Sequence, residues 1–453
     1  MTSREQVGDL WTLAGGEATD LDRLAFSGPA HVLPSPFAVT EVAATSAAAA
    51  TLAAAELLEA RGGPRQDVSI DRGHAAASFS AERLLRLDGK PVGAWADLSG
   101  AYATHDGRYL QLHCNFPHHA QGVANHLGVP LERPAFEAAI AAREAVDLEG
   151  ELIEAGMVAV AYRTLEEWDA HPHATATKAL PAFDLCRLGA DGDRPLPPAD
   201  RPLEGVRVLD CSRVLAGPVA GMTLASHGAD VLRVGADHLP TTDSGVMSTG
   251  FGKRSANIDL RTNEGKATFT RLLEDADVMI DAFRPGALEA LGFGPDEVAR
   301  IRPGIVMVQL CGFDWIGPWG GRRGFDSIIQ STTGIALAAA GEDGRPVHLP
   351  VQALDHATGF LAAFAAMRGL ARRQSEGSSW LARLSLLRTR NWLLALGDGG
   401  SPETPIDLDA YTHEVDSTFG RMRAVSAVGG LPASPPRWDR APSEIGSSAA
   451  EWL

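Results

Sequence analysis

One turn in the second half of the chain has the composition of a helix start that could bind an anion. The segment reads SRVLAGPVAG, from Ser212 to Gly221, and it follows a short apolar run. Proline is favoured in the first turn of a helix, because its fixed φ suits the helix and its missing N–H would have no partner there. Gly217 and Pro218 therefore predict a helix start. The pattern also allows a binding function, in which free backbone N–H groups face an anionic ligand.

A second candidate is the acid in the segment PVQALDHATGFLAAFAAM. Asp355 stands just before a long Ala-rich helical run, and Asp is a preferred residue at the N-cap of a helix. By pattern alone, a capping role is the favoured interpretation. His356 beside it is read as incidental.

Other common catalytic and cofactor motifs are missing from the sequence. There is no GxSxG motif, no P-loop and no GxGxxG motif. His171 and His173 flank a proline, and His118 and His119 are adjacent, so none of them has the i, i+4 spacing of a helical zinc site. We therefore predict no metal centre and interpret these histidines as turn or surface residues.

The charge balance and cysteine usage narrow the class of protein. The 453 residues include 40 Lys and Arg against 57 Asp and Glu, a formal net charge of −17. This balance argues against a nucleic-acid partner, which needs a basic surface. The cysteines lie far apart without a CxxC pair, as is typical of a reduced cytosol: Cys114, Cys186, Cys211 and Cys311. We expect a cytoplasmic protein with no signal peptide and no membrane partner, since the Ala-rich run at 43–55 is too short for a membrane span.

A proline-rich segment between Gly189 and Leu203 divides the chain. Dense prolines block helix formation and strand pairing, so the segment predicts an extended linker. The resulting domains are a smaller α+β domain with an Ala-rich helix at 1–190, a linker at 191–203, a core at 204–397 and a C-terminal tail at 398–453.

After the linker, short apolar runs alternate with helical segments. The strand-like runs are VRVLDCS, DVLRV, DVMIDAF and GIVMVQLCGF, and the helical segments are GPVAGMTLASHG, EGKATFTRLLEDA and GALEALG. Such alternation predicts βαβ units. The fold class is therefore α/β, with a Rossmann-like open parallel sheet in the second half and helices on both faces.

The first half has a mixed pattern. A helix is predicted over the Ala-rich stretch at 42–61, and the segment YATHDGRYLQLH predicts a hairpin around the turn Asp106–Gly107. These patterns favour a smaller α+β domain.

One segment of the first half echoes the second. AATLAAAELLEAR, which ends at Arg61, is similar to LAAFAAMRGLARR, which ends at Arg373. If this echo is a duplication, Ala43 occupies the place that Asp355 holds in the second copy.

The spaced segments of the second half together resemble the core of the family III CoA-transferases. LEGVRVLDCSRVLAGPVAG, GKRSANIDLRTNEGK and DVMIDAFRPGALEALGFGPDEVARIRPG occur in the family's order between about Leu203 and Leu396. This CaiB/BaiF group includes formyl-CoA transferase, carnitine CoA-transferase and α-methylacyl-CoA racemase. The first half is similar to the family's smaller domain, which in typical members follows the core. The chain thus looks like a permuted or partly duplicated member.

The resemblance implies an acyl-CoA:carboxylate CoA-transferase with Asp355 as its nucleophile. In the family a single Asp attacks the acyl-CoA thioester, which gives a mixed anhydride and then an aspartyl-CoA thioester. The implied partners are an acyl-CoA and a carboxylic acid acceptor, with coenzyme A as substrate and no tightly bound cofactor. The family also implies a homodimer.

The resemblance also implies a set of coenzyme A contacts. Residues near the thioester end are Val214, Leu215 and Ala216; those near the adenine and phosphates are Ile258 and Arg261; those near the nucleotide and pantetheine are Phe283 and Arg284. Arg is suited to phosphate, because its planar fork can form two parallel hydrogen bonds.

Several positions depart from the family pattern and keep two alternatives open. Phe325 stands where the racemases have a catalytic His, although Asp326 beside it matches the family. Gly235 and Ala236 replace a Glu and a polar or basic residue, and Ala282 and Ala290 replace an Asn and an Arg of the formyl-CoA type. The alternatives are a 2-methylacyl-CoA racemase or isomerase and a non-catalytic acyl-CoA-binding paralogue.

Overall fold

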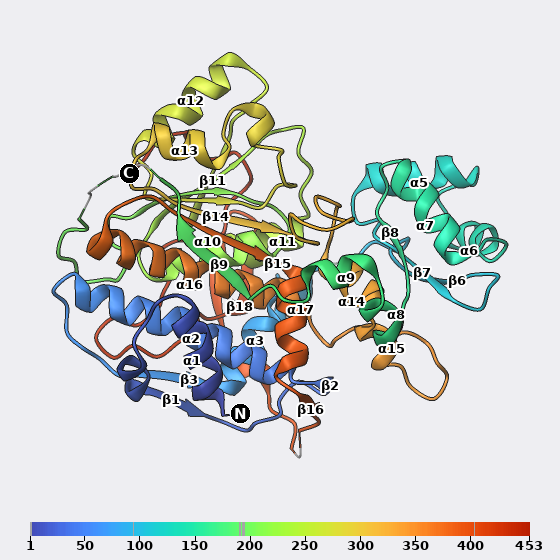
Figure 1. The fold of residues 1–453 in the computed structure, drawn as a ribbon, viewed down its shortest axis with the longest axis horizontal. Helices are drawn as coiled ribbons and strands as arrows, with labels where there is room; N and C mark the ends of the chain where they lie inside the picture. Colours follow the sequence, from blue (N-terminus) through green and yellow to red (C-terminus); the bar gives the residue numbers. More distant parts are fainter. Residues whose placement is uncertain (1, 94, 190–191, 193–194, 403) are drawn as a thin grey trace.

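The computed structural model describes residues 2–93, 95–189, 192, 195–402 and 404–453. Residues 190, 191, 193 and 194, on which part of the predicted linker falls, lie outside the described residues. Figure 1 shows a layered core to which a smaller group of helices and strands is attached on one side.

A seven-stranded sheet in the order β12-β11-β10-β13-β14-β15-β9 forms the core. Its strands are β9 (Phe183–Arg187), β10 (Arg207–Cys211), β11 (Asp230–Gly235), β12 (Lys253–Asn257), β13 (Val278–Asp281), β14 (Val306–Cys311) and β15 (Trp380–Ser385). All neighbouring pairs are parallel except β9 with β15. The predicted fold class is confirmed, and it follows from strands that are apolar because both faces of the sheet are covered.

Helices lie on both faces of this sheet (Figure 1). One layer contains α12 (Asn263–Glu274) and α13 (Pro295–Ile301); the other contains α10 (Ala216–Ser226) and α16 (Ala353–Glu376). The segment GALEALG forms only a short 3₁₀ turn, η2 (Glu289–Leu291), and not the predicted helix. Gly286 and Gly292 both have positive φ at its ends, which leaves room for a single turn.

Further helices surround the carboxyl ends of the strands. They are α11 (Asp243–Thr249), α14 (Asp326–Thr332), α15 (Ile335–Ala338) and α17 (Leu386–Ala395).

The first half packs its Ala-rich helix directly against the core. Its elements are α1 (Ser3–Leu13), η1 (Ala18–Arg23), β1 (Leu24–Ser27), β2 (Ser35–Phe37), α2 (Val39–Ala60), β3 (Val68–Asp71), α3 (Arg72–Phe79) and α4 (Ala81–Leu84). Helix α2 lies against α16, and small Ala side chains allow the two to approach closely. Among the described residues α2 alone is long and apolar enough to cross a membrane, but 89% of its most apolar window is buried inside the protein.

The two halves of the suspected duplication therefore meet in space. Each Ala-rich helix is followed by a strand in a parallel pair, β3 with β1 and β15 with β14. Each helix also ends in a buried Arg that donates to loop carbonyls: Arg61 to Pro202 and Glu204, and Arg373 to Gly304.

The group at the side contains the predicted hairpin. Strands β6 (Gly100–Ala103), β7 (Tyr109–Leu112) and β8 (Ala159–Ala161) form an antiparallel sheet covered by α5 (Pro117–Leu127), α6 (Arg133–Ile140) and α7 (Ala145–Glu154). Two short helices, α8 (Leu165–Asp169) and α9 (Pro172–Thr177), lead back to the core.

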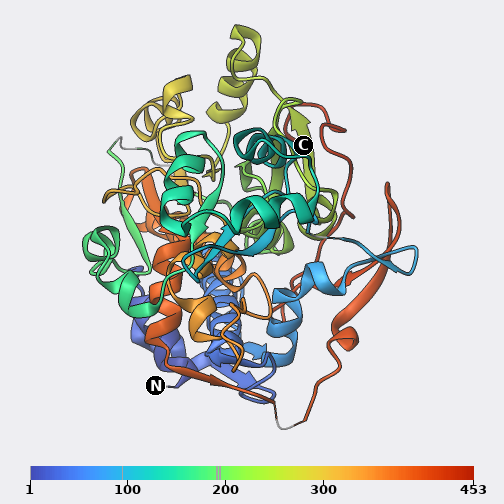
Figure 2. The same cartoon turned by 90° about the vertical axis from the view of Figure 1, so that its right-hand side faces the viewer.

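The C-terminal residues pair with the first half. Strands β17 (Thr412–Ser417) and β18 (Gly420–Val425) form a four-stranded sheet with β4 (Arg86–Leu87) and β5 (Lys90–Pro91), beside which they lie in Figure 2. Strand β16 (Asp398–Gly400) pairs with β2. A last 3₁₀ turn is η3 (Leu408–Tyr411). The predicted domain boundaries stay a prediction. Strand β9, from the predicted first domain, pairs with β15 of the core, and the C-terminal strands β16 and β18 pair with β2 and β4 of the first half.

Candidate active site

Asp355 is near the start of α16, but its side chain does not cap that helix. The N-cap residue is Gln352, which makes no side-chain capping bond. The free backbone N–H groups of Leu354 and Asp355 instead donate to Oδ2 of Asp326, at 2.8 and 2.9 Å. A carboxylate from α14 thus provides the cap. The capping interpretation of Asp355 is wrong, because that role is filled from another element.

Asp326 is held in place by its own network. It is fully buried at the first turn of α14, and its Oδ1 accepts a hydrogen bond from Nε2 of Gln330. Burial raises the pKa of Asp326 to about 6, against the opposing effect of the backbone and Gln330 hydrogen bonds. This geometry leaves the carboxyl of Asp355 free for another function.

The Asp355 carboxyl lies in an environment that disfavours its charge. The side chain is buried, with only 7% of its surface exposed. Burial raises its pKa well above the ordinary value, and the nearby charges of Asp326 and Glu82 raise it further. A hydrogen bond from the backbone N–H of Ala216 acts in the opposite direction. A poorly solvated carboxylate oriented by a single N–H is more basic than one in water and hence a better nucleophile.

His356 forms part of the support around this acid. Its Nε2 lies 3.1 and 3.2 Å from the carboxylate oxygens of Glu82, and its ring stacks on Phe79 at 5.1 Å between centroids. The histidine that the sequence left without a role therefore fixes a second carboxylate beside Asp355.

Asp355 lines two cavities, of about 770 and about 410 Å³. Both cavities also share Phe116, Val214, Leu215 and Phe325, so Asp355 lies in a largely apolar wall between them. Phe116 comes from the first half of the chain and the others from the second. The two halves of one chain therefore form this site together.

The larger cavity is cationic. Its cationic lining residues are Arg213, Arg284, Arg322 and Arg323, and Asp237 adds one negative charge beside that of Asp355. Arg322 is bound to Glu149, and Arg213 donates to the carbonyl of Pro240, whereas Arg284 is exposed. Such a cavity suits a phosphorylated ligand despite the acidic net charge of the chain.

The smaller cavity has a mostly apolar lining with a few charged groups. Aromatic and aliphatic side chains predominate, including Phe79, Val92, Trp95 and Val351, and Glu82 and Arg83 provide charges. This composition suits an aliphatic group with a polar end.

The predicted coenzyme A contacts separate into two groups. The larger cavity is lined by Val214, Leu215, Ala216, Phe283 and Arg284 together with Asp355. Ile258 is instead buried in the apolar cluster beneath α12, and Arg261 is exposed and paired with Asp259 at 2.7 Å. Contact of these two residues with coenzyme A stays a prediction.

The backbone at Val214 is strained. Its φ is 72°, a region that β-branched residues rarely adopt and that costs of order 1–3 kcal/mol. Val214 is followed by the start of α10, where the N–H of Ala216 reaches Asp355. Strain stored at this turn places the helix start against the acid.

Sequence reasoning missed a group of histidines from the first half. His113 stacks face to face on Phe325, with ring centroids 3.7 Å apart, and lines the smaller cavity. The Nδ1 atoms of His113 and His119 are buried and have no hydrogen-bond partner among the described residues. Burial lowers the pKa of His113 to about 3 and of His119 to about 4, so both rings are neutral.

The interpretation of these histidines as turn or surface residues is wrong for two of the four. His119 is buried beside Phe325, and His173 is fully buried, with Nε2 2.6 Å from the carbonyl oxygen of Phe313. The aromatic and histidine-rich segment LHCNFPHHA was the signal for the cavity wall. Among the described residues, no group of three or more His, Cys, Asp and Glu side chains could hold a metal ion.

The family model and the curated relatives of the chain both name CoA transfer. The family model for CoA-transferase family III matches residues 203–396. A probable fatty acyl-CoA transferase of Mycobacterium tuberculosis is 32% identical over 199 residues, which are 41% of this chain and 50% of the relative. The succinyl-CoA:glutarate CoA-transferase of Mus musculus is 32% identical over 202 residues, 42% of this chain and 46% of the relative.

Solved structures include a CaiB/BaiF family protein from Brucella suis, which is 28% identical, covers 49% of this chain and 65% of that chain, and has a TM-score of 0.40. The chain spans about half the length of the curated relatives it matches. The matched segment contains β10 to β15 together with Asp326 and Asp355. The resemblance seen in the sequence is therefore confirmed: residues 203–396 match the model of CoA-transferase family III.

Proposed function

We propose that the protein is an acyl-CoA:carboxylate CoA-transferase with Asp355 as its nucleophile. The observation that carries the proposal is the Asp355 carboxyl, which is buried, does not cap α16 and lies in the wall between two cavities. The relatives that the matched segment resembles have CoA-transferase names, and this supports the same class of reaction here.

The reaction begins when a carboxylate oxygen of Asp355 attacks the thioester carbonyl of the donor. The C–S bond breaks, coenzyme A leaves as a thiolate, and a mixed anhydride forms. The thiolate then attacks the aspartyl carbonyl carbon, so the donor acid leaves with one aspartyl oxygen and an aspartyl-CoA thioester remains. An acceptor carboxylate reverses these steps. One activated acyl bond persists throughout, and no net electron or proton is consumed.

The surrounding residues have distinct roles in this proposal. The backbone N–H of Ala216, which lowers the pKa of Asp355, would support negative charge at this carboxyl. Leu215 and Phe325 would exclude water, which would hydrolyse the anhydride. The cationic larger cavity would bind the phosphates of coenzyme A, and the smaller cavity would take the acyl chain and the acceptor acid.

Both halves of one chain line these cavities, so each chain would contain a complete site. A homodimer and a cytoplasmic location are part of the proposal but are not needed to form the site.

Transfer between a succinyl-CoA donor and a series of carboxylic acids tests the proposal. Wild-type protein incubated with acyl-CoA and hydroxylamine should yield a protein hydroxamate, and Asp355→Ala should abolish both hydroxamate and transfer. Asp9→Asn, on the exposed side of α1, is the matched control and should leave both unchanged. Transfer by Asp355→Ala at the wild-type rate would contradict the proposal.

A second candidate is an acyl-CoA isomerase that removes and returns the α-proton. Phe325 cannot move a proton, but His113 stacks on it and His119 lies beside it. Each of these histidines has an Nδ1 atom without a hydrogen-bond partner within the described ranges of the chain. Incubation of a 2-methylacyl-CoA in D₂O distinguishes the two functions. Incorporation of deuterium at the α-carbon by wild type, but not by His113→Phe, would favour the isomerase. No incorporation by the wild-type protein would exclude this function.

A further inference from the structure

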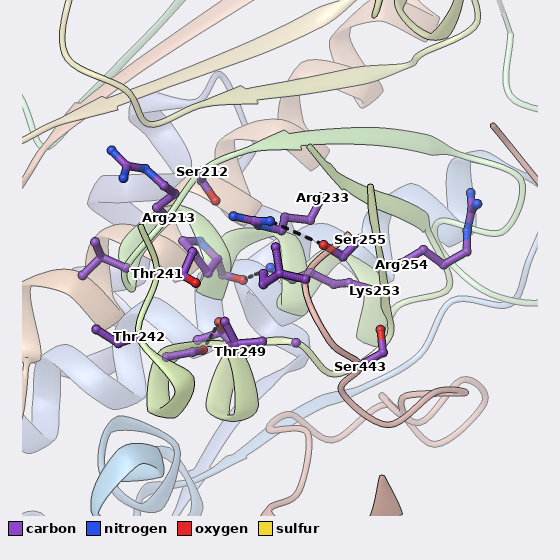
Figure 3. A pocket seen from close by; sticks show the side chains of 16 residues that line it. Ser212, Arg213, Arg233, Thr241, Thr242, Thr249, Lys253, Arg254, Ser255 and Ser443 are labelled. Carbon is purple, nitrogen blue, oxygen red and sulfur yellow. Dashed lines mark hydrogen bonds between the residues drawn. The ribbon is translucent and has the colours of Figure 1, made fainter. Parts of the chain in front are cut away.

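A small cavity next to the candidate active site has an unusual charge composition. It has a volume of about 50 Å³ and lies between the ends of β11 and β12, the loop at 241–242 and the C-terminal segment at 443–445. Figure 3 shows Arg233, Lys253 and Ser255 around this space, whereas Arg254 points away from it. Asp355 does not line this cavity.

Two buried cations face a single carboxylate here. Lys253 Nζ donates to Oδ2 of Asp210 at 2.7 Å and to the carbonyl of Pro218 at 2.6 Å. Oδ1 of Asp210 accepts from the hydroxyl of Ser212. Asp210 is therefore paired with Lys253. Its charge also acts on Arg233, its register partner on β11, but no carboxylate of the described residues forms a salt bridge with the Arg233 guanidinium.

Arg233 is more than nine-tenths buried, with 8% of its surface exposed. Its Nη1 donates weakly to the hydroxyl of Ser255 at 3.4 Å, and its Nη2 has no hydrogen-bond partner in the part of the chain that the structure describes. A buried, unpaired guanidinium is costly, and an anion in the adjacent space would remove that cost.

Gly235, two positions along the strand, lies directly against the guanidinium of Arg233. A Cβ at Gly235 would lie 2.5 Å from Nη1 and 2.8 Å from Nη2 of Arg233. The guanidinium therefore occupies the place that a side chain at 235 would take.

We propose that this cavity binds one tetrahedral oxyanion of the phosphate class through Arg233. A guanidinium presents two parallel N–H donors that match such an anion. The hydroxyls of Thr241, Thr242 and Ser443 line the same space and have a proton to donate. The volume exceeds by a few times the space that one water molecule needs and is enough for one such group.

Two sources share this chemistry: free inorganic phosphate and a phosphate group of coenzyme A. The cavity meets the larger cavity at Arg213 and Val214, so a nucleotide phosphate could reach it. The proposal does not depend on acyl transfer and is tested without an acyl-CoA.

Thermal unfolding in increasing inorganic phosphate, at fixed pH and ionic strength, is the test. Wild type and the exposed control Arg300→Met should show the same saturable rise in Tm, because the anion binds only the folded chain. Arg233→Met should bind phosphate at least about tenfold more weakly. Gly235→Asp places a carboxylate against the guanidinium and should lose the phosphate response.

Equal phosphate responses in wild type and both cavity variants would overturn the proposal, as would an equal rise with acetate in place of phosphate. A phosphate titration repeated in saturating coenzyme A or dephospho-CoA separates the two sources. Loss of the phosphate response with coenzyme A alone assigns the site to its 3′-phosphate, and persistence with both assigns it to free phosphate. If Asp355→Ala loses acyl transfer but keeps the phosphate response, the phosphate site is supported independently of acyl transfer.

Discussion

Replacement of Asp355 by asparagine is expected to abolish transfer and, at the same time, to stabilise the fold. Burial and two neighbouring carboxylates raise the pKa of Asp355, so the folded chain binds its proton more tightly than the unfolded chain does. The cost of this carboxyl is absent below the unfolded pKa of about 3.9 and increases as the pH rises above it. Asparagine has nearly the same shape and carries no charge.

The size of the effect follows from the contacts. The carboxylate has one backbone hydrogen bond to offset its burial, and an under-compensated buried polar group costs about 1–3 kcal/mol. A chain of 453 residues unfolds with an entropy of about 1 kcal/mol/K, so the variant should melt about 1–3 °C higher at pH 8.

Circular dichroism melts of wild type and Asp355→Asn between pH 4 and pH 8 measure this difference. The advantage of the variant should vanish towards pH 4, and the exposed Asp9→Asn control should follow the wild type throughout. A variant that is less stable than wild type at pH 8 would refute the reasoning, since it would mean that the fold uses the Asp355 charge.

Three further predictions concern the surroundings of the acid and a buried ion pair elsewhere in the core. Glu82→Gln removes a charge that raises the pKa of Asp355, so the acidic limb of the pH–rate profile should move to lower pH; an unshifted limb contradicts this. Gly359→Ala places a Cβ 2.6 Å from the carbonyl oxygen of Ala216, so it should cost about 1–3 kcal/mol in urea unfolding and reduce transfer, and wild-type kinetics would disprove the close contact. Arg388→Met leaves a fully buried carboxylate without its cation and should lower the free energy of unfolding by about 3–5 kcal/mol; a loss below 1 kcal/mol would rule out a tight pair.

The sheet could be predicted because its signal is local. Strands covered on both faces are apolar throughout, so runs such as 206–212 and 304–313 were recognisable without any tertiary information. The two edge strands, β12 and β9, were not recognised. KRSAN is a polar segment without an apolar run. FDLCR is half exposed, and its pairing partner, β15, follows almost 200 residues later. Pairing over such distances leaves no local trace in the sequence.

The role of Asp355 could not be decided from its own segment. An Asp before a helix usually caps it, and only the position of Asp326, brought in from α14, shows that the cap is already filled. The histidines were misjudged for a similar reason: the wall that buries His119 is built around Phe325, a residue of the other half of the chain. Site residues contributed by another element are determined by packing, which periodicity does not describe.

Peptide mass spectrometry of the protein after incubation with an acyl-CoA donor alone tests the central claim most directly. We predict a coenzyme A adduct, sensitive to hydroxylamine, on the peptide that contains Asp355 and on no other peptide, together with one equivalent of released donor acid. An adduct on a different residue, or release of the acid only after an acceptor is added and without any covalent species, would contradict the account.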